Sequence, residues 1–306
     1  MFNGSHEIVI FVLFLLFIFI MLALDLGVFN KRSHVLKFKE ALIWTAFWVG
    51  ISLAFYLFLR LFGDQLHNLD TIEQIKANIA KYKHPIKVDG LSLQAALELY
   101  NRNLSLEYIT GYLIEYSLSV DNIFVIILIF ISFNIQTRYY HRVLFWGILG
   151  AIVMRFIFIF LAGYLIQRFE GLLYVFGAFL VIIGGKMGWE FFFSKGEEKI
   201  DPHHHPVVKF ISKRIPVTAE ERGSRFYIIE EGKFLITPLL IVLILIELMD
   251  VVFAVDSVPA VFSVTRDPFI VFFSNIFAIL GLRSLFFLVN NVMDLFHYLK
   301  LGLAFL

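Results

Sequence analysis

Residues 234–262 read FLITPLLIVLILIELMDVVFAVDSVPAVF, and this stretch decides the class of the protein. A helix needs about 20 predominantly apolar residues to cross roughly 30 Å of hydrocarbon, and this run is long enough. Three acids, Glu247, Asp250 and Asp256, nevertheless interrupt it. An acid at the centre of a membrane helix costs about 2.5–3.5 kcal/mol on insertion scales and usually marks a functional site. The stretch therefore predicts a membrane span with a functional polar face.

The composition of the whole chain agrees with a membrane protein. Of its 306 residues, 59% are hydrophobic and 37 are Phe, and the mean hydropathy is +0.82. Soluble domains are about 45–50% apolar. A net charge of +1 provides no field for nucleic acid, so we expect no nucleic-acid partner. The sequence contains no Cys, which excludes disulfides, thiolate metal sites and thiol redox chemistry from these residues.

Apolar runs of spanning length recur along the chain and predict an all-α, polytopic bundle of transmembrane helices. We expect spans at residues 7–29, 41–62, 108–133, 143–166, 172–193, 234–262 and 269–291. The first run lacks the cleavage site of a signal peptide, so we expect it to be retained. An eighth run begins at Leu301 and stops at Leu306, which indicates either a truncated span or a tail packed at the interface.

Lys and Arg in the loops predict the orientation. They gather after the first span, between the third and fourth spans, and between residues 194 and 233. These loops share one side if the spans alternate, and positive loops are cytoplasmic, so we expect the N-terminus outside. The insert at 63–106, with helix-like text at 71–83 and 92–102, then lies outside. The expected regions are an N-terminal transmembrane pair (1–62), an extracytoplasmic insert (63–106), a first repeat (107–193), a cytoplasmic loop (194–233) and an incomplete second repeat (234–306).

Two segments of the chain repeat each other. Residues 115–122, EYSLSVDN, resemble residues 250–257, DVVFAVDS: each begins with an acid and places Val-Asp before a small polar residue. Each is followed by a span that contains an arginine, Arg155 or Arg283. The third and sixth expected spans run in opposite directions, so the repeats are inverted, as in many secondary transporters. We therefore expect the two acidic helices to meet near the midplane of the membrane.

The expected spans hold more acids than cations. The acids are Asp25, Glu115, Asp121, Glu247, Asp250 and Asp256, and the cations are Arg155, Lys186 and Arg283. The surplus acids must be protonated, hydrated or paired with a bound cation. Ser119, Asn122 and Ser257 add further oxygens, and an all-oxygen set favours Mn²⁺, Mg²⁺ or Ca²⁺ over Zn²⁺ or Cu⁺. The residues alone do not choose among these metals, and a pathway for protons only stays open.

Three features have two interpretations each. Pro259 frees a backbone carbonyl, which is either a metal ligand or the result of a packing kink. Asp25 lies near a helix end, where it either snorkels to the surface or lines an ion path. His203, His204 and His205 stand between prolines, and a polar loop is a simpler interpretation than a metal site.

The motifs resemble those of the TerC family of membrane proteins, which includes the Alx type. The resemblance is carried by GYLIEYSLSVDN (111–122), GILGAIVMR (147–155), YVFGAFL (174–180), ELMDVVFAVDSVPAVF (247–262) and DPFIVFFSNIFAILGLR (267–283). The family is named for tellurium resistance, but its Alx-type members are associated with Mn²⁺ export from bacteria. The resemblance therefore implies a multi-pass exporter in a bacterial inner membrane. Relatives continue through the eighth span, usually with a counterpart of Lys186.

Two functions from different classes follow. The first is export of a divalent cation, most simply Mn²⁺, through an acidic midplane site without a tightly bound cofactor. Its expected metal ligands are Asp25, Glu115, Asp121, Asn122, Glu247, Asp250, Asp256 and Ser257, and Arg155, Lys186 and Arg283 are expected to form ion pairs or gates. The second is a membrane scaffold for stress responses or membrane-protein insertion, in which the same charges are structural. We expect no enzyme, because no Ser/His pair, zincin motif or P-loop occurs in the spans.

Overall fold

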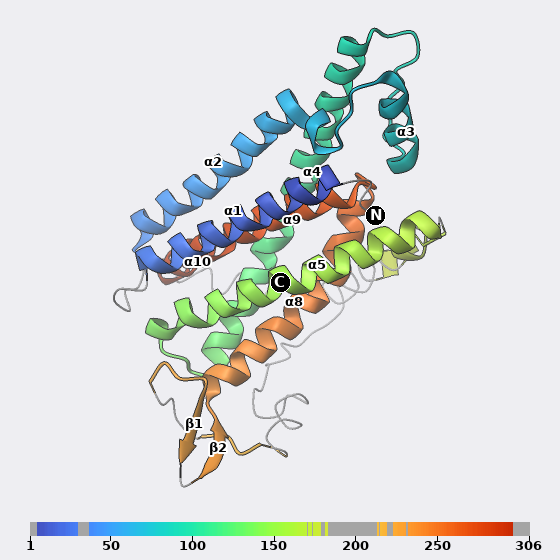
Figure 1. Ribbon diagram of the computed structural model, residues 1–306. Coiled ribbons are helices and arrows are strands. Elements are labelled where there is room, and N and C mark those ends of the chain that lie inside the picture. The colour runs from blue at the N-terminus through green and yellow to red at the C-terminus, as the bar shows by residue number, and fades with distance from the viewer. Residues whose placement is uncertain are drawn as a thin grey trace.

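The structure is a computed structural model, and it describes residues 5–29, 37–169, 171–172, 174–178, 181–182, 213, 215–218, 223–230 and 232–295. The side chains of residues 5–6, 23–29, 233 and 293–295 lie outside this description. Within it, the chain is a bundle of helices with one small β-hairpin (Figure 1). The predicted all-α membrane class is confirmed.

The elements follow the chain in simple order. The helices are α1 (Ser5–Phe29), α2 (Phe38–Phe62), α3 (Ile72–Tyr82), α4 (Leu93–Ser132), α5 (Tyr140–Arg168), α8 (Pro238–Phe262), α9 (Pro268–Leu280) and α10 (Leu282–Leu295), with short 3-10 turns η1 (Gly63–Leu66) and η2 (Thr137–Tyr139). Strands β1 (Tyr227–Glu230) and β2 (Lys233–Ile236) form an antiparallel hairpin. In the described part of the chain, α2, α4, α5 and α8 are long and apolar enough to cross a membrane, and the bent pair α9–α10 provides a fifth span if it is counted as one. The helix α1 adds a shorter apolar stretch, Glu7–Leu22.

Three expected boundaries differ from the structure. The run at 234–262 begins as strand β2, where the ring of Phe234 stacks on Tyr227 at 5.4 Å, and α8 starts only at Pro238. The helix-like text at 92–102 is not a separate helix of the insert but the start of α4, because Ser92 caps it and no Gly or Pro interrupts residues 93–110. The span at 269–291 bends by 41° where α9 meets α10. The spans expected at 172–193 and beyond 295 lie mainly or wholly outside the described residues.

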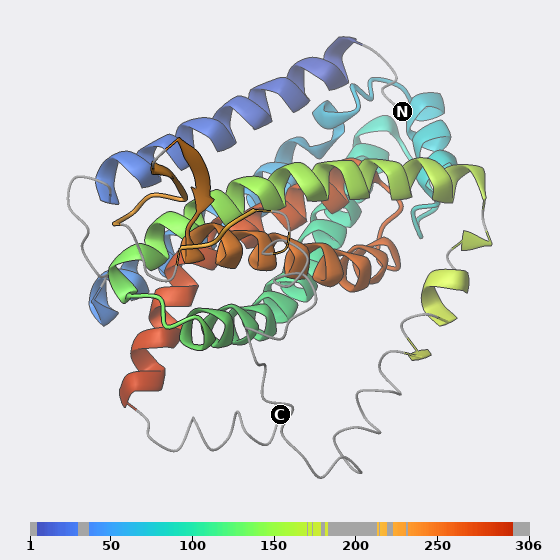
Figure 2. The same cartoon turned by 90° about the horizontal axis from the view of Figure 1, so that it is seen from below.

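In the bundle, each helix of the first repeat packs against a helix of the second repeat. Helix α4 packs against α9, and α5 packs against α8; the second pair runs side by side in the view from below (Figure 2). Helices α4 and α8 also contact each other directly. A two-fold axis that exchanges α4 with α8 and α5 with α9 would produce this pattern, as the inverted repeats predict.

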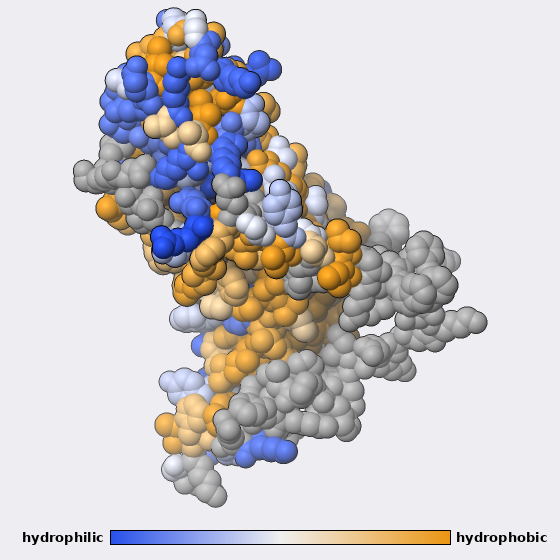
Figure 3. All heavy atoms as spheres, turned by 90° about the vertical axis from the view of Figure 1, so that its right-hand side faces the viewer, coloured by the Kyte–Doolittle hydropathy of each residue, from blue (hydrophilic) through white to orange (hydrophobic). Residues whose placement is uncertain are grey.

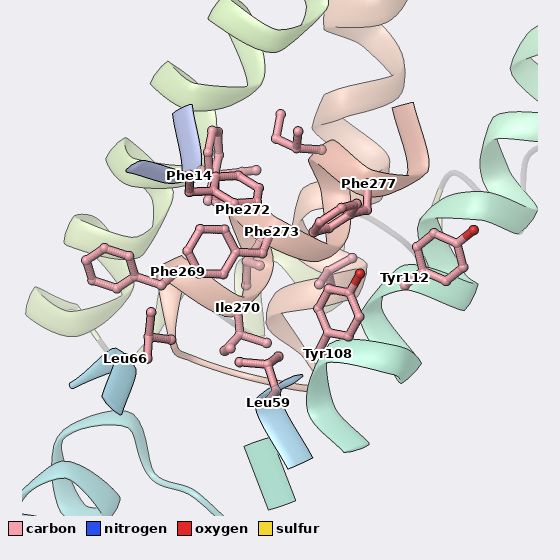
Figure 4. Packing of buried hydrophobic residues seen from close by; sticks show 14 of the residues in the cluster. Phe14, Leu59, Leu66, Tyr108, Tyr112, Phe269, Ile270, Phe272, Phe273 and Phe277 are labelled. Atoms are coloured by element: carbon pink, nitrogen blue, oxygen red, sulfur yellow. The ribbon is translucent and has the colours of Figure 1, made fainter. Parts of the chain in front are cut away.

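Helix α9 is the central column of the bundle. Every one of its residues is buried, which is typical of a helix that is surrounded by protein on all sides. Figure 4 shows its phenylalanines packed between α1 and α4. The ring centroids of Phe14 in α1 and Phe273 in α9 are 4.3 Å apart. The residues drawn at this interface include Phe14, Tyr108, Tyr112, Phe269, Phe272, Phe273 and Phe277.

The ends of the bundle are polar and its middle is apolar. Figure 3 shows hydrophobic residues over the middle of one face and hydrophilic residues gathered at the end that carries α3. The hairpin lies at the opposite end (Figure 1). Forty residues of α4 span about 60 Å at 1.5 Å per residue, which is longer than a bilayer is thick. Helix α4 therefore extends from the membrane into the insert.

Candidate functional site

Arg155 lies at the centre of the bundle and joins four helices. It belongs to α5, and only 1% of its surface is exposed. One terminal nitrogen, Nη1, donates to the carboxylate of Glu115 in α4 and, at 2.8 Å, to Oδ1 of Asn275 in α9. The other, Nη2, donates to Oδ1 of Asp250 in α8 at 3.2 Å. These hydrogen bonds bring α4, α5, α8 and α9 together at one buried charged site.

Asn275 completes the site, although it is not among the site residues that we expected from the sequence. Its Nδ2 donates to Oε2 of Glu115 at 2.8 Å, so Glu115, Arg155 and Asn275 form a closed ring of hydrogen bonds. A buried amide is costly unless both of its ends are hydrogen-bonded, and here both are. The signal was present in the sequence as a lone amide within the apolar run 268–280.

Among the described residues, the site has more negative than positive charge and has unused hydrogen-bonding capacity. Two carboxylates, Glu115 and Asp250, face one guanidinium. Within the described residues, Asp250 Oδ2 and Arg155 Nε are buried without a hydrogen-bond partner. A cavity of about 30 Å³ lies beside them and is lined by Asn122, Arg155 and Asp250 together with apolar residues. This volume has room for about two water molecules or a small cation, at roughly 10–15 Å³ each.

Glu247 lies one turn before Asp250 and reaches across to α5. Its carboxylate lies so close to Gly150 that a methyl group at this position would overlap it. Small residues let membrane helices approach each other closely, and Gly150 does so here. A third acid is thereby held at the interface between α5 and α8.

The two acidic helices present matching faces. On α4, Glu115, Ser119 and Asn122 follow each other at helical spacing and are buried, and on α8 the buried Ser257 lies two turns after Asp250. The hydroxyl oxygens of Ser119 and Ser257 are buried without a hydrogen-bond partner in the described part of the chain.

Asp121 and Asp256 lie on a different side of these helices. Asp121 is exposed and Asp256 is half-buried, and neither joins the hydrogen bonds of Arg155. Six residues separate each of them from Glu115 or Asp250, which corresponds to about 120° around the helix.

The family model described as "Integral membrane protein TerC family" matches residues 100–306, which include every residue of the Arg155 cluster. The chain belongs to the TerC family. An uncharacterised membrane protein of Myxococcus xanthus is 43% identical over 95% of this chain and 78% of its own length. Two Alx proteins, which carry the name of candidate membrane-bound redox modulators, come from Escherichia coli K12 (39% identical over 93% of this chain and 78% of the relative) and Photorhabdus laumondii (38% over 95% and 81%). No solved structure matches the chain.

Some expected site residues of this TerC-family chain lie elsewhere. The described part of the chain does not include the side chain of Asp25. It also does not include Lys186, His203, His204 or His205. Arg283 is 4% exposed at the start of α10, close to the bend, and it does not belong to the hydrogen bonds around Arg155. Its expected role in an ion pair or gate stays a prediction.

In the described residues, no three His, Asp or Glu side chains are arranged to hold a metal ion. The geometry of the Arg155 cluster provides a physical reason. The guanidinium lies between Glu115 and Asp250, at the place where a cation shared by these two acids would lie. A metal ion can use both carboxylates only after Arg155 has moved away from at least one of them.

Proposed function

We propose that this TerC-family protein exports a divalent cation, most simply Mn²⁺, across a bacterial inner membrane through the site around Arg155. The observation that supports the proposal is one arginine shared by Glu115 and Asp250 in the core of the bundle, beside a cavity of about 30 Å³. Membrane proteins place buried ionisable groups of this kind on ion and substrate pathways. In transporters with inverted repeats the site lies at the interface between the repeats.

The imbalance of charge favours a transport site over a structural ion pair. A purely structural pair needs one acid for one base, because each further buried charge has to be desolvated. Here Glu115 and Asp250 share one guanidinium, and Glu247 lies one turn away from Asp250. The excess negative charge among the described residues, and the lack of a partner for Asp250 Oδ2 among them, favour a second, exchangeable cation.

Arg155 acts in this mechanism as a resident cation that competes with the metal. When a divalent ion enters the cavity, Asp250 and Glu115 bind it through their oxygens, with the side-chain oxygens of Asn122 and Asn275 as further hard ligands. The guanidinium then withdraws from the carboxylates. When Arg155 returns, it displaces the ion, which leaves towards the other side. Competition between two cations for the same carboxylates thus provides both binding and release.

Asp121 and Asp256 are proposed as a second pair of acids outside the Arg155 cluster, because they face about 120° away from Glu115 and Asp250. They lie six residues, or about 9 Å along the helix axis, beyond Glu115 and Asp250. In the proposed orientation the loop at 194–233 is cytoplasmic and the N-terminus is outside. The coupling ion is a proton or another cation that enters as the metal leaves.

The alternative is a scaffold in which the Arg155 cluster only holds the four helices together. The hydrogen bonds from Arg155 to three helices favour this function as a second candidate. Redox modulation, the activity in the name of the Alx relatives, would need a chemistry other than thiol exchange here, because these 306 residues contain no Cys.

Transport of Mn²⁺ into proteoliposomes tests the proposal. We expect wild-type protein to move Mn²⁺, and Glu115→Gln and Asp250→Asn to lose the activity. Glu98→Gln is the matched control, because Glu98 is an exposed acid on the same helix as Glu115. Melting curves show whether each variant is folded. If wild-type protein moves none of Mn²⁺, Mg²⁺, Ca²⁺ or Zn²⁺, or if both folded variants transport like wild type, the proposal is wrong and the scaffold is favoured.

A further inference from the structure

A second buried cation, His67, lies at the insert end of the molecule. His67 follows η1, and its side chain is 1% exposed. Its Nδ1 lies 2.9 Å from Oε1 of Glu7 in α1, and its Nε2 lies 2.8 Å from Oδ2 of Asp267 in the turn between α8 and α9. Ionised carboxylates only accept hydrogen bonds, so a ring that is bonded to two of them carries hydrogen on both nitrogens and is an imidazolium. One cation thus joins the start of α1, the insert and the α8–α9 turn.

The hydrogen bonds continue from this site into the insert. Thr265, in the same turn, donates to Oε2 of Glu107 in α4 at 2.5 Å, and its hydroxyl accepts from the backbone N–H of Asp267 at 3.3 Å. Glu107 Oε1 lies 2.8 Å from Nδ1 of His84 and accepts from Asn103 Nδ2 at 2.7 Å. The network therefore fastens the insert to the membrane helices at two points, His67 and His84.

The groups around His67 favour its charged form. Burial alone would lower the pKa of His67, but the charges and hydrogen bonds of Asp267 and Glu7 outweigh burial and raise this pKa to about 9. Burial opposes ionisation of Asp267, yet His67 keeps the pKa of Asp267 below its ordinary value. Tyr82 of α3 packs its ring 5.4 Å from His67, and burial raises the pKa of Tyr82, so it stays neutral. Further ionisable groups nearby are Tyr100, whose pKa burial raises, the paired His84 and Glu107, and Lys81, whose ammonium lies 4.6 Å from the centre of the Tyr82 ring.

The network is tied to the Arg155 cluster through two helices. Asp267 caps α9 by accepting from the backbone N–H of Phe269, and Asn275 follows eight residues later on the same helix. Glu107 precedes Glu115 by eight residues on α4. Eight residues correspond to about 12 Å along a helix.

The core between the two sites is aromatic. It contains the phenylalanines of α9 shown in Figure 4, and Phe11, one turn after Glu7, packs against Phe269 at 5.9 Å. Because this core joins α1, α4 and α9, a movement of these helices at the His67 end can reach the Arg155 cluster.

We propose that Glu7, His67 and Asp267 form a proton-operated latch, which holds α1 and the insert on the α8–α9 turn while the imidazole is charged and releases them when it loses its proton. A neutral imidazole has one N–H, so one carboxylate would lose its donor and both would lose their counter-ion. Buried carboxylates without a counter-ion are strongly destabilising, and movement apart lets water reach them. The effect of release on the cation path rests on the proposed function, whereas the latch itself does not.

Distances between two spin labels test the latch directly. Ala77 on α3 and Ser263 in the α8–α9 turn are both exposed, and the absence of native Cys lets each be replaced by a labelled Cys without other changes. In lipid nanodiscs at pH 7 we expect one narrow distance distribution. Above a pH of about 9 to 10 we expect a second, longer and broader component. Nitrogen-15 spectra of labelled histidine report when His67 becomes neutral.

Three variants show whether the change in distance depends on the charge of His67. His67→Gln has no charge and should show the longer component at every pH. Asp267→Asn retains the cap of α9 but removes one carboxylate, so release should move to lower pH. Lys76→Gln is the control, because the pair between Lys76 and Asp89 is an exposed ion pair of the same insert, and its distribution should match wild type.

One narrow distribution in wild-type protein whose His67 is neutral, or in folded His67→Gln, would overturn the latch. If His67→Gln does not fold, an unchanged transition in Asp267→Asn would overturn it equally. The readout is a distance and needs no metal, so the result is separate from that of Mn²⁺ transport.

Discussion

The Arg155 cluster and the His67 latch share one arrangement and differ in one chemical property. In each, a buried cation lies between two carboxylates that come from different parts of the chain, Glu115 and Asp250 in the first and Glu7 and Asp267 in the second. An arginine keeps its proton in proteins, whereas a histidine can lose its proton, and the raised pKa of His67 places that loss near pH 9. Arg155 can therefore only be displaced, and His67 can be discharged.

The surroundings of the two sites fit this difference. A cavity of about 30 Å³ adjoins Arg155, and an oxygen of Asp250 there has no partner among the described residues. Both carboxylate oxygens of Asp267 are engaged, one by His67 and one by the backbone N–H of Phe269. The first site thus combines a cavity with an oxygen that has no partner among the described residues, whereas both oxygens of Asp267 in the second site are already hydrogen-bonded. Under the two proposals, a buried cation between two acids serves ion exchange where it keeps its proton and switching where it can lose its proton.

The largest effect on stability should come from removing Arg155, the cation that keeps its proton. Arg155→Ala strands Glu115 and Asp250 in the core, and breaking a buried pair typically costs about 3–5 kcal/mol. We expect little folded protein and a much lower melting temperature. Arg155→Lys restores the charge without the planar fork and should recover part of the stability. Normal melting of Arg155→Ala would contradict the central role of this ion pair.

A smaller effect on stability should depend on pH at His67 and not at Arg155. The pKa of His67 is raised from 6.5 to about 9 in the folded protein, so its contribution to stability is complete below pH 6.5 and is lost as the pH rises through 9. A shift of this size corresponds to about 3 kcal/mol at 1.36 kcal/mol per pKa unit.

We expect the free energy of unfolding, measured by denaturant titration in mixed micelles, to fall between pH 6.5 and 10 in wild type. His67→Gln, which has no such group to titrate, should lose this part of the pH dependence. Equal pH dependence of the two proteins would remove the distinction drawn between His67 and Arg155.

The sequence predicted the membrane class from its long apolar runs. It predicted the main charged residues because they interrupt these runs. Glu115, Arg155 and Asp250 are visible as charges within long hydrophobic runs, and the repeated motif relates Glu115 to Asp250 through the sequence alone. The pairing among six acids and three cations was not predictable. It depends on how each helix is rotated about its axis, and this rotation turns Asp121 about 120° away from Glu115.

Neutral and distant partners were missed for other reasons. Asn275 carries no charge, and its importance arises only from contact with Glu115 and Arg155. His67 is 60 residues from Glu7 and 200 residues from Asp267 along the chain. In sequence His67 belongs to a polar insert, where a solvated residue is the ordinary expectation. Only the packing of the insert against α1 and the α8–α9 turn shows that it is buried.

The most direct test of the cation site is a titration of purified protein with Mn²⁺ by calorimetry at fixed pH. The comparison is between wild type, Asp250→Asn and the control Asp89→Asn, whose acid is exposed on the insert. Loss of one carboxylate ligand removes about 1.5–3 kcal/mol of charged-group interaction, so Asp250→Asn should bind at least about tenfold more weakly. Asp89→Asn should bind like wild type. If Asp250→Asn melts normally and titrates with Mn²⁺ like wild type, Arg155 does not occupy a metal site and the proposed exporter mechanism is wrong.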